Sequence, residues 1–317
     1  MTSGLLILGG LVLLAVGGEL LVRGAVGVAY RLHISPLLAG LTIVGFGTST
    51  PELATSIQAA LGGSPGIALG NVIGSNIANI LLILGVSAIV LPLTVDPAAF
   101  RRDGIALAGS TALCVAAVLM GVIGPVMGVI LLTALVGYVY WAYRSEKGSG
   151  DPEEARHRAE TEAAMPRAPS AFALALMVSG GLAGAIFGAK LLVDGAVAIA
   201  SAAGISEAVI GLTIVAVGTS LPELVACLVA VWKKHPEIAL GNIVGSNIYN
   251  VLGILGITAI IRPLEVPAEI ARFDIWVLVA VTALLLVQLR SGWRMSRAEG
   301  VLLVALAVGY TVFLLMR

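Results

Sequence analysis

The chain has 317 residues, of which 59% are hydrophobic and 11% charged, and its mean hydropathy is +1.05. Soluble domains carry about 25% charged residues, so this composition excludes a soluble protein and predicts an integral membrane protein. The formal net charge is +0, and the basic residues are spread over loops, which gives no indication of a nucleic-acid partner. Cys114 and Cys227 lie in distant apolar runs, which favours two buried thiols over a disulfide or a metal site.

The apolar runs predict ten transmembrane spans, because a bilayer core needs about 20 apolar residues per helix. These spans are 4–30, 36–61, 66–91, 102–122, 125–143, 170–202, 207–232, 237–261, 272–289 and 297–316. The first run has no basic segment before it and is long enough to span, so it is predicted to be a helix rather than a cleaved signal peptide. Loops after the odd-numbered spans hold about 13 Lys and Arg, against about three on the opposite side, which places both termini outside the cytoplasm.

Residues 40–85 recur at 211–256 with an offset of 171 and no gap, and about 27 of the 46 aligned positions are identical. Five spans per half is an odd number, so the second half is predicted to enter the membrane upside down. We therefore expect an all-α membrane protein of ten transmembrane helices in two inverted-topology repeats, 1–144 and 170–317, as is typical of secondary transporters. Residues 145–169 are charged and poor in large apolar side chains, which predicts a cytoplasmic linker.

One charge pair lies inside the first span of each half. Glu19 stands four residues before Arg23, and Lys190 stands four residues before Asp194, so each couple can form an i,i+4 ion pair with the signs reversed between halves. We interpret both couples as neutralised structural pairs rather than as a proton relay.

Each copy of the repeat places a carboxylate in an otherwise apolar helix, Glu52 in the first and Glu223 in the second. Pro51 and Pro222 precede them and lack the N–H that would bond the carbonyl four residues back. The helix should therefore break there and free main-chain oxygens. Such backbone is tolerated at membrane depth only where it is buried in protein or lines a cavity.

Polar side chains surround each carboxylate in the sequence. Hydroxyls precede it by one helical turn, and the next span carries a polar stripe with a period of four residues. The hydroxyls are Thr48, Ser49, Thr219 and Ser220, and the stripes are Asn71, Ser75, Asn79 and Asn242, Ser246, Asn250. For Asn71 and Asn242 two interpretations stay open, an ion ligand or an amide that holds broken helices together.

All of these groups are hard oxygen donors, which suit Ca²⁺ or Na⁺ rather than Zn²⁺ or Cu⁺. Two carboxylates carry a charge of about −2, which one Ca²⁺, two Na⁺ or two protons could each neutralise. Ions that compete for one compensating site are the physical basis of antiport. No nucleophile, metal-ligand cluster or cofactor loop accompanies the carboxylates, which disfavours an intramembrane enzyme, and a channel would need a continuous wetted pore.

The motifs 47–52 (GTSTPE) with 70–76 (GNVIGSN), and 218–223 (GTSLPE) with 241–247 (GNIVGSN), resemble the two alpha-repeats of the cation/calcium antiporter superfamily. The closest resemblance is to its prokaryotic sodium/calcium exchanger branch, and it covers essentially the whole chain. It implies an antiporter of the plasma (inner) membrane, without a cofactor, that exchanges Ca²⁺ for Na⁺ as a monomer in the lipid bilayer. It also implies that spans 1 and 6 slide across the remaining helices to alternate access.

The same resemblance implies a set of metal ligands. These are Glu52, Glu223, Thr48, Ser49, Ser75, Asn79, Thr219, Ser220, Ser246 and Asn250, with main-chain carbonyls near Gly45 and Ala216. Some relatives carry Asp at the position of Asn250, and in the potassium-dependent branch that carboxylate is tied to K⁺. An amide here argues against K⁺ dependence, while a Ca²⁺/H⁺ antiporter that uses the same carboxylates stays open as the alternative.

Overall fold

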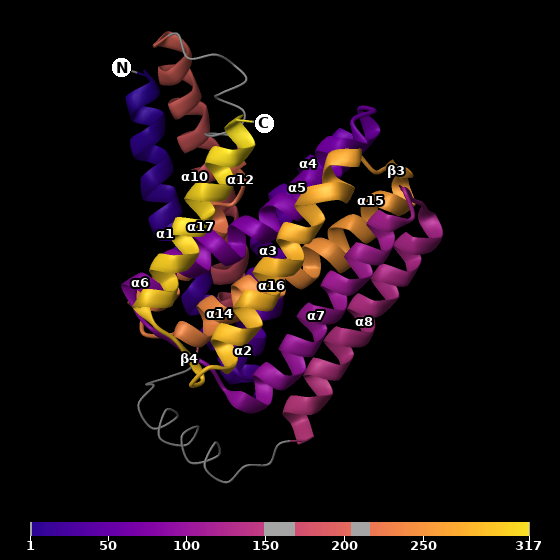
Figure 1. Ribbon diagram of the computed structural model, residues 1–317. Helices are drawn as coiled ribbons and strands as arrows, with labels where there is room; N and C mark the ends of the chain where they lie inside the picture. The colour runs from indigo at the N-terminus through magenta and orange to yellow at the C-terminus, as the bar shows by residue number, and fades with distance from the viewer. Residues whose placement is uncertain (1, 149–168, 204–215, 317) are drawn as a thin grey trace.

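The computed structural model describes residues 2–148, 169–203 and 216–316, and it is helical through most of its length (Figure 1). The first half comprises α1 (Thr2–Leu32), α2 (Pro36–Ala39), η1 (Gly40–Val44), α3 (Gly45–Thr48), α4 (Thr50–Leu61), α5 (Pro65–Ala78), η2 (Asn79–Leu84), α6 (Gly85–Val90), β1 (Leu93–Thr94), α7 (Pro97–Leu119), β2 (Val122–Ile123) and α8 (Pro125–Gly148).

The second half comprises α10 (Ala171–Ala202), α12 (Ala216–Thr219), α13 (Leu221–Trp232), α14 (Pro236–Tyr249), η4 (Asn250–Leu255), α15 (Gly256–Ile261), β3 (Leu264–Glu265), η5 (Ile270–Asp274), α16 (Ile275–Arg290), β4 (Arg294–Met295) and α17 (Arg297–Met316). Helices labelled η are π-helices, whose turns are wider than those of an α-helix.

Eight helices in the described chain are long and apolar enough to cross a bilayer. They are Ser3–Leu32, Pro65–Val90, Pro97–Leu119, Pro125–Glu146, Ala171–Ala202, Pro236–Ile261, Ile270–Arg290 and Arg297–Met316. The predicted span 36–61 is instead divided at Ser49 into two shorter pieces. The predicted span 207–232 is described only from Ala216, because residues 204–215 lie outside the described chain.

The long helices α1 and α10 run side by side (Figure 1). Their crossing depends on glycines that allow the two backbones to touch. A Cβ added to Gly17 would lie 2.5 Å from the main-chain nitrogen of Ala185, and one added to Gly188 would lie 2.7 Å from that of Leu14. The two helices therefore pack backbone to backbone.

The charge pairs of these two helices form as predicted. Arg23 Nε lies 2.5 Å from Glu19 Oε1, and Lys190 Nζ lies 2.9 Å from Asp194 Oδ2. A third partner was not predicted: Lys233, directly after α13, places Nζ 2.6 Å from Glu19 Oε1. Glu19 thus links α1 to α13 as well as to the next turn of its own helix.

Two short β-pairs join the halves, although the sequence predicts only helices. Strand β1 pairs antiparallel with β4 in the register Leu93↔Met295, and β2 pairs with β3 in the register Ile123↔Leu264. All four of these side chains are fully buried. Each pair takes one strand from each half, so it fixes the loops of one half against those of the other.

The start of α7 differs from the prediction, which began this span at Arg102. Asp96 caps the helix by accepting hydrogen bonds from the main-chain N–H groups of Ala98 and Ala99, and Pro97 occupies the first helical position. The helix therefore begins five residues earlier, and Arg102 lies inside it, 6% exposed.

The end of the first half also extends further than predicted. Helix α8 continues to Gly148, so the first residues of the expected linker 145–169 are helical. Residues 149–168, the greater part of that linker, lie outside the described chain.

Candidate cation-binding site

The helix break predicted at each proline is confirmed. Ser49 lies between α3 and α4 with φ −79° and ψ 10°, and Ser220 lies between α12 and α13 with φ −91° and ψ 7°. Pro51 and Pro222 each occupy the second position of the helix that follows, where a missing N–H is tolerated. Glu52 and Glu223 therefore lie in the first turns of new helices.

The expected release of a carbonyl is wrong for the first half. Thr50 Oγ1 donates a hydrogen bond of 2.7 Å to the Gly47 carbonyl, which replaces the N–H that Pro51 lacks. Leu221 stands at the position of Thr50 in the second half and has no hydroxyl to do the same. The two breaks thus share a geometry but differ in how the main chain is satisfied.

The two carboxylates are brought together across the interface between the halves. Ser49 Oγ donates to Glu223 Oε1 at 3.1 Å, and Ser220 Oγ donates to Glu52 Oε1 at 3.5 Å. Both glutamates are 1% exposed. Among the described residues neither of them forms an ion pair with Lys or Arg. Two buried acidic groups therefore share one region without a basic side chain between them.

Four oxygen atoms in this region accept no hydrogen bond from any described residue. They are Oε2 of Glu52, Oε2 of Glu223, Oδ1 of Asn79 and Oδ1 of Asn250. A buried polar atom without a partner costs about 1–3 kcal/mol, so four such acceptors in one region call for a common partner. A cation supplies what all four lack. Helix α4, which carries Glu52, packs against η4, and α13, which carries Glu223, packs against η2. Each glutamate helix therefore lies beside the π-helix of the other half that begins with the asparagine.

Further predicted residues lie at the crossing of α3 and α14. Ser246 Oγ donates to the Gly45 carbonyl at 3.1 Å, and Thr48 Oγ1 lies 2.9 Å from the Val44 carbonyl and 3.3 Å from Asn242 Oδ1. A Cβ on Gly45 would lie 2.9 Å from the Asn242 carbonyl oxygen, so only glycine permits this approach. Thr48, Ser246 and the Gly45 carbonyl therefore sit at the interface of the halves.

The remaining predicted residues are less fully defined. Ser75 is 8% exposed on α5, one helical turn before Asn79. Thr219 is half-buried at the end of α12. Ala216 begins that helix at the edge of the described chain, so no contact is assigned to its carbonyl.

Asn71 and Asn242 act as the amides that hold the broken helices together. Asn71 Nδ2 donates to the Glu52 carbonyl at 3.0 Å and to Ser56 Oγ at 2.9 Å. Asn242 Nδ2 donates to the Glu223 carbonyl at 3.3 Å and lies 3.1 Å from Cys227 Sγ. These bonds fix the first turn of each glutamate helix against the next span, which favours the second of the two open interpretations.

The sequence interpretation did not select Asn76 and Asn247. Both lie beside the predicted polar stripe, one residue after its serine, and both are buried. Asn76 contacts Asn250, which lies three residues after Asn247, and Asn247 contacts Asn79, which lies three residues after Asn76. The spacing of three residues before Asn79 and Asn250 was the available signal, because such residues lie one turn apart on a helix.

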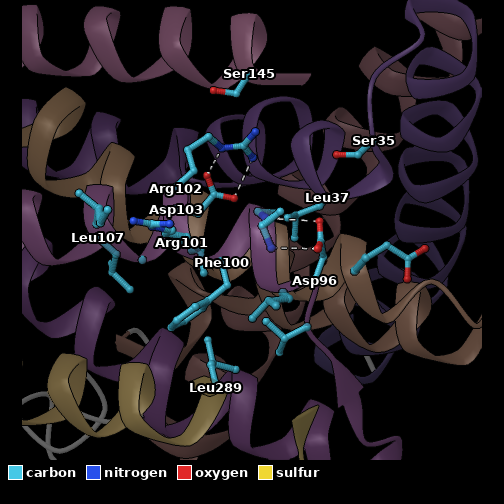
Figure 2. Close-up of a pocket in the computed structure, with 18 of the residues that line it drawn as sticks. Ser35, Leu37, Asp96, Phe100, Arg101, Arg102, Asp103, Leu107, Ser145 and Leu289 are labelled. Carbon is cyan, nitrogen blue, oxygen red and sulfur yellow. Dashed lines mark hydrogen bonds and ion pairs between the residues drawn. The ribbon is translucent and has the colours of Figure 1, made fainter. Parts of the chain in front are cut away.

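Outside this region, a cavity of about 560 Å³ opens at the start of α2 and α7 and the end of α8 (Figure 2). Two charged residues of its lining pair with each other: Arg102 Nε lies 2.7 Å from Asp103 Oδ1. None of the predicted ion ligands lines it. Arg102 is thus already paired with Asp103 and, at 3.5 Å, with Glu146.

The donor set fits a hard cation better than a transition metal. Among the described residues no group of three or more His, Cys, Asp and Glu side chains could hold a metal ion. What converges instead is two carboxylates with hydroxyl, amide and main-chain oxygens, the ligand types of Ca²⁺. The donor set of the site therefore suits reversible binding of a hard cation.

Known proteins resemble the chain over its full length. The putative antiporter CaxA of Alkalimonas amylolytica is 39% identical, with 99% of each chain covered. The sodium/calcium exchanger MaX1 of Methanosarcina acetivorans is 33% identical, with 98% of this chain and 97% of that protein covered. A structure of the sodium-calcium exchanger NCX_Mj, soaked with Na⁺ and Sr²⁺, matches with a TM-score of 0.83 at 33% identity, over 97% of this chain and 96% of that chain.

The eight long apolar helices make the chain a multi-pass membrane protein, and its relatives are exchangers and antiporters rather than enzymes. The family described as sodium/calcium exchanger protein matches residues 2–144 and 173–316. The resemblance drawn from the two motifs is thereby confirmed, and the chain belongs to the sodium/calcium exchanger family.

Proposed function

We propose that this chain is a secondary antiporter that exchanges Ca²⁺ for Na⁺ across the plasma membrane, by alternating access to a site that contains Glu52 and Glu223. The observation that carries the proposal is the group of four buried acceptor oxygens, on Glu52, Glu223, Asn79 and Asn250, that accept no hydrogen bond from any described residue. Two of them belong to carboxylates, so the site has both the oxygen ligands and the negative charge that a divalent or several monovalent cations require.

Competition between the two ions follows from the same charges. The pair of glutamates carries a charge of about −2 in a region from which water is excluded, where charges interact more strongly than in water. One Ca²⁺ neutralises that charge, and so do two Na⁺. A site that cannot be left charged in the membrane must exchange one load for the other, which is coupled antiport.

The ligand assignments are part of this proposal. Ser49 and Ser220 would each stabilise the carboxylate of the opposite half, so that an ion held there contacts both halves. The oxygen set would be completed by Thr48, Thr219, Ser75, Ser246 and the carbonyls of Gly45 and Ala216. Asn79 and Asn250, which we call the corner amides, would each add a side-chain oxygen at the edge of the site. An ion that contacts both halves resists their separation, which links occupancy to the conformational change.

We further propose ten spans in two inverted repeats, 1–144 and 170–317, joined by the linker 145–169, with both termini outside the cytoplasm. Two observations support this arrangement. The helices 36–48 and 221–232 are apolar but short, and each belongs to a broken span, which adds two spans to the eight long helices. The family model also matches the chain in two separate segments. We propose a monomer as the functional unit, which light scattering of the purified protein in detergent would test.

Removal of one carboxylate tests the function. In proteoliposomes, Glu52→Gln and Glu223→Gln should each abolish ⁴⁵Ca²⁺ flux driven by a Na⁺ gradient, because a neutral amide halves the charge of the site. Glu237→Gln is the matched control, because this glutamate lies in the first turn of α14 beside His235 and carries no ligand role. Near-normal exchange in both glutamine variants of the proposed site would refute the assignment.

The coupling ion is tested by imposing gradients of Na⁺, K⁺ and H⁺ separately. The proposal expects Ca²⁺ flux with Na⁺ alone, and no stimulation by K⁺, because both corners are amides. Flux driven by a pH gradient in Na⁺-free buffer would assign the chain to Ca²⁺/H⁺ antiport through the same carboxylates.

A further inference from the structure

Two asparagines outside the proposed ligand set form a reciprocal contact between α5 and α14. Asn76 Nδ2 donates to the main-chain carbonyl of Asn247 at 3.2 Å, and Asn247 Nδ2 donates to that of Asn76 at 3.2 Å. The two side chains are 2% and 1% exposed. A main-chain carbonyl can only accept a hydrogen bond, so it forces each amide to present its nitrogen. The orientation of both amides is thereby fixed by the backbone.

This orientation sets the polarity of a second pair of amides. With its nitrogen committed, Asn76 presents Oδ1 to Asn250 Nδ2 at 3.0 Å, and Asn247 presents Oδ1 to Asn79 Nδ2 at 3.1 Å. Because the partner atom is an acceptor, Asn79 and Asn250 must each turn the nitrogen toward it. We call these four amides the asparagine relay. The oxygens of Asn79 and Asn250 then face away from it, buried and with no donor among the described residues.

We propose that Asn76 and Asn247 are positioning residues that set the polarity of Asn79 and Asn250, so that both corner amides offer oxygen rather than NH₂ to a cation. The inference rests on the proposed cation site. Without the relay, a corner amide could rotate by half a turn and present two N–H donors, which repel a cation. Asn76 acts on Asn250 and Asn247 acts on Asn79, so each half controls the corner of the other.

The proposal differs from a merely structural role in one respect. A helix contact needs only shape and some hydrogen bond, whereas the relay needs an oxygen at Oδ1 of Asn76. Asn76→Asp keeps that oxygen toward Asn250, and in its neutral form the carboxyl also donates to the Asn247 carbonyl. Asn76→Leu keeps the approximate volume and removes the oxygen. The relay therefore requires Asn250 to keep its orientation in the Asp variant and to lose it in the Leu variant.

The composition of the chain makes the orientation directly observable. Its only asparagines are Asn71, Asn76, Asn79, Asn242, Asn247 and Asn250, all within the repeated segments 40–85 and 211–256. Protein labelled with ¹³C and ¹⁵N at the asparagine side chains gives one amide signal for each, assigned by single substitutions. In the wild type, Ca²⁺ should shift the ¹³Cγ signals of Asn79 and Asn250 most, because their oxygens bind it.

Asn76→Leu should abolish the Ca²⁺ response of Asn250 but leave that of Asn79, and Asn247→Leu should do the reverse. The apparent Ca²⁺ affinity of each variant should fall about tenfold. This is the effect of losing one ligand whose contribution is similar to that of a hydrogen bond. Gln288→Leu is the matched control, because it removes a buried amide on α16 that carries no ligand role, and it should leave both responses intact.

A wild-type response of Asn250 in Asn76→Leu would overturn the proposal, as would loss of the Asn250 response in both the Leu and the Asp variants. If Asn76→Leu does not fold, the wild type without ions decides: through-hydrogen-bond transfer between Asn250 ¹⁵Nδ2 and Asn76 ¹³Cγ is expected, and its absence would contradict the relay. An absence of Na⁺-driven ⁴⁵Ca²⁺ flux in the wild type would refute the proposed function instead, because the ion-free measurement does not depend on transport.

Discussion

The two halves of the molecule are nearly the same around the carboxylates and differ at the periphery. The relay of four asparagines and the serine–glutamate contacts recur on both sides of the interface. Further out, Tyr138 donates to Asp103 at 3.0 Å, and Tyr310 donates to Asp274 at the same distance. The residue before each aspartate differs, however: it is Arg102 in the first half and Phe273 in the second.

The difference between Arg102 and Phe273 changes the contacts around each aspartate. Arg102 binds Asp103 through Nε and Nη2, and Nη1 reaches the carbonyl of Ala142 and Glu146 Oε1. Glu146 in turn accepts from the main-chain N–H and the hydroxyl of Ser35. Phe273 instead packs on Phe313, with ring centroids 4.7 Å apart. A charge network in one half thus corresponds to an aromatic contact in the other.

The comparison teaches where the two halves must agree. Ser35 caps α2, which leads through η1 to Gly45 and Thr48, so the network ties the start of one site helix to α7 and α8. The side chains proposed to meet the ion are alike in the two halves, as a shared ion would require. The Arg102 network and the Phe273–Phe313 contact need only hold their helices in place, so different side chains can serve in the two halves.

The largest effect is expected from Arg102→Leu. It leaves Asp103 and Glu146 partly buried without their cation, and breaking a buried ion pair on one side costs about 3–5 kcal/mol. The free energy of unfolding in detergent should fall by that amount, while Phe273→Leu should cost about 1 kcal/mol. Arg101→Leu, an exposed neighbour, is the control. A loss below about 1 kcal/mol in Arg102→Leu would mean that the network does not support the first half.

A smaller effect is expected from Gly45→Ala. The new methyl group would lie 2.9 Å from both the Asn242 carbonyl oxygen and the Ser246 main-chain nitrogen, so α3 and α14 must separate. Overpacking of this kind costs about 1–3 kcal/mol, and the Ser246–Gly45 hydrogen bond should be lost. Thermal unfolding and ⁴⁵Ca²⁺ flux measure the two consequences. Gly70→Ala has open space around its Cβ and should be nearly neutral; equal behaviour of the two variants would contradict the close approach.

The smallest effect is expected where the halves differ by one atom. Ser56 accepts from Asn71, whereas Cys227 stands at the corresponding position opposite Asn242. Sulfur is a weak acceptor, so Ser56→Cys should destabilise the protein and Cys227→Ser should not, with a difference of about 0.5–1.5 kcal/mol between them. Unfolding of both single variants and of the double exchange measures it. Equal effects would show that these amides depend on the main chain alone.

The sequence by itself determined the elements that local chemistry decides. The repeat located the two carboxylates. The prolines located the helix breaks and apolar length located the long helices, because both signals act within one segment of the chain. The sequence also identified the family, because the two motifs are specific to it. The charge pairs in α1 and α10 followed from a spacing of four residues.

Only the tertiary structure decided what depends on contacts between distant segments. The burial of Arg102, the strands that join the halves and the polarity of the asparagine amides each require partners more than 30 residues away. An amide can present either oxygen or NH₂, and no local rule chooses between them. The choice is made by a main-chain carbonyl of the opposite half, which the sequence places 171 residues away and the fold places within hydrogen-bond distance.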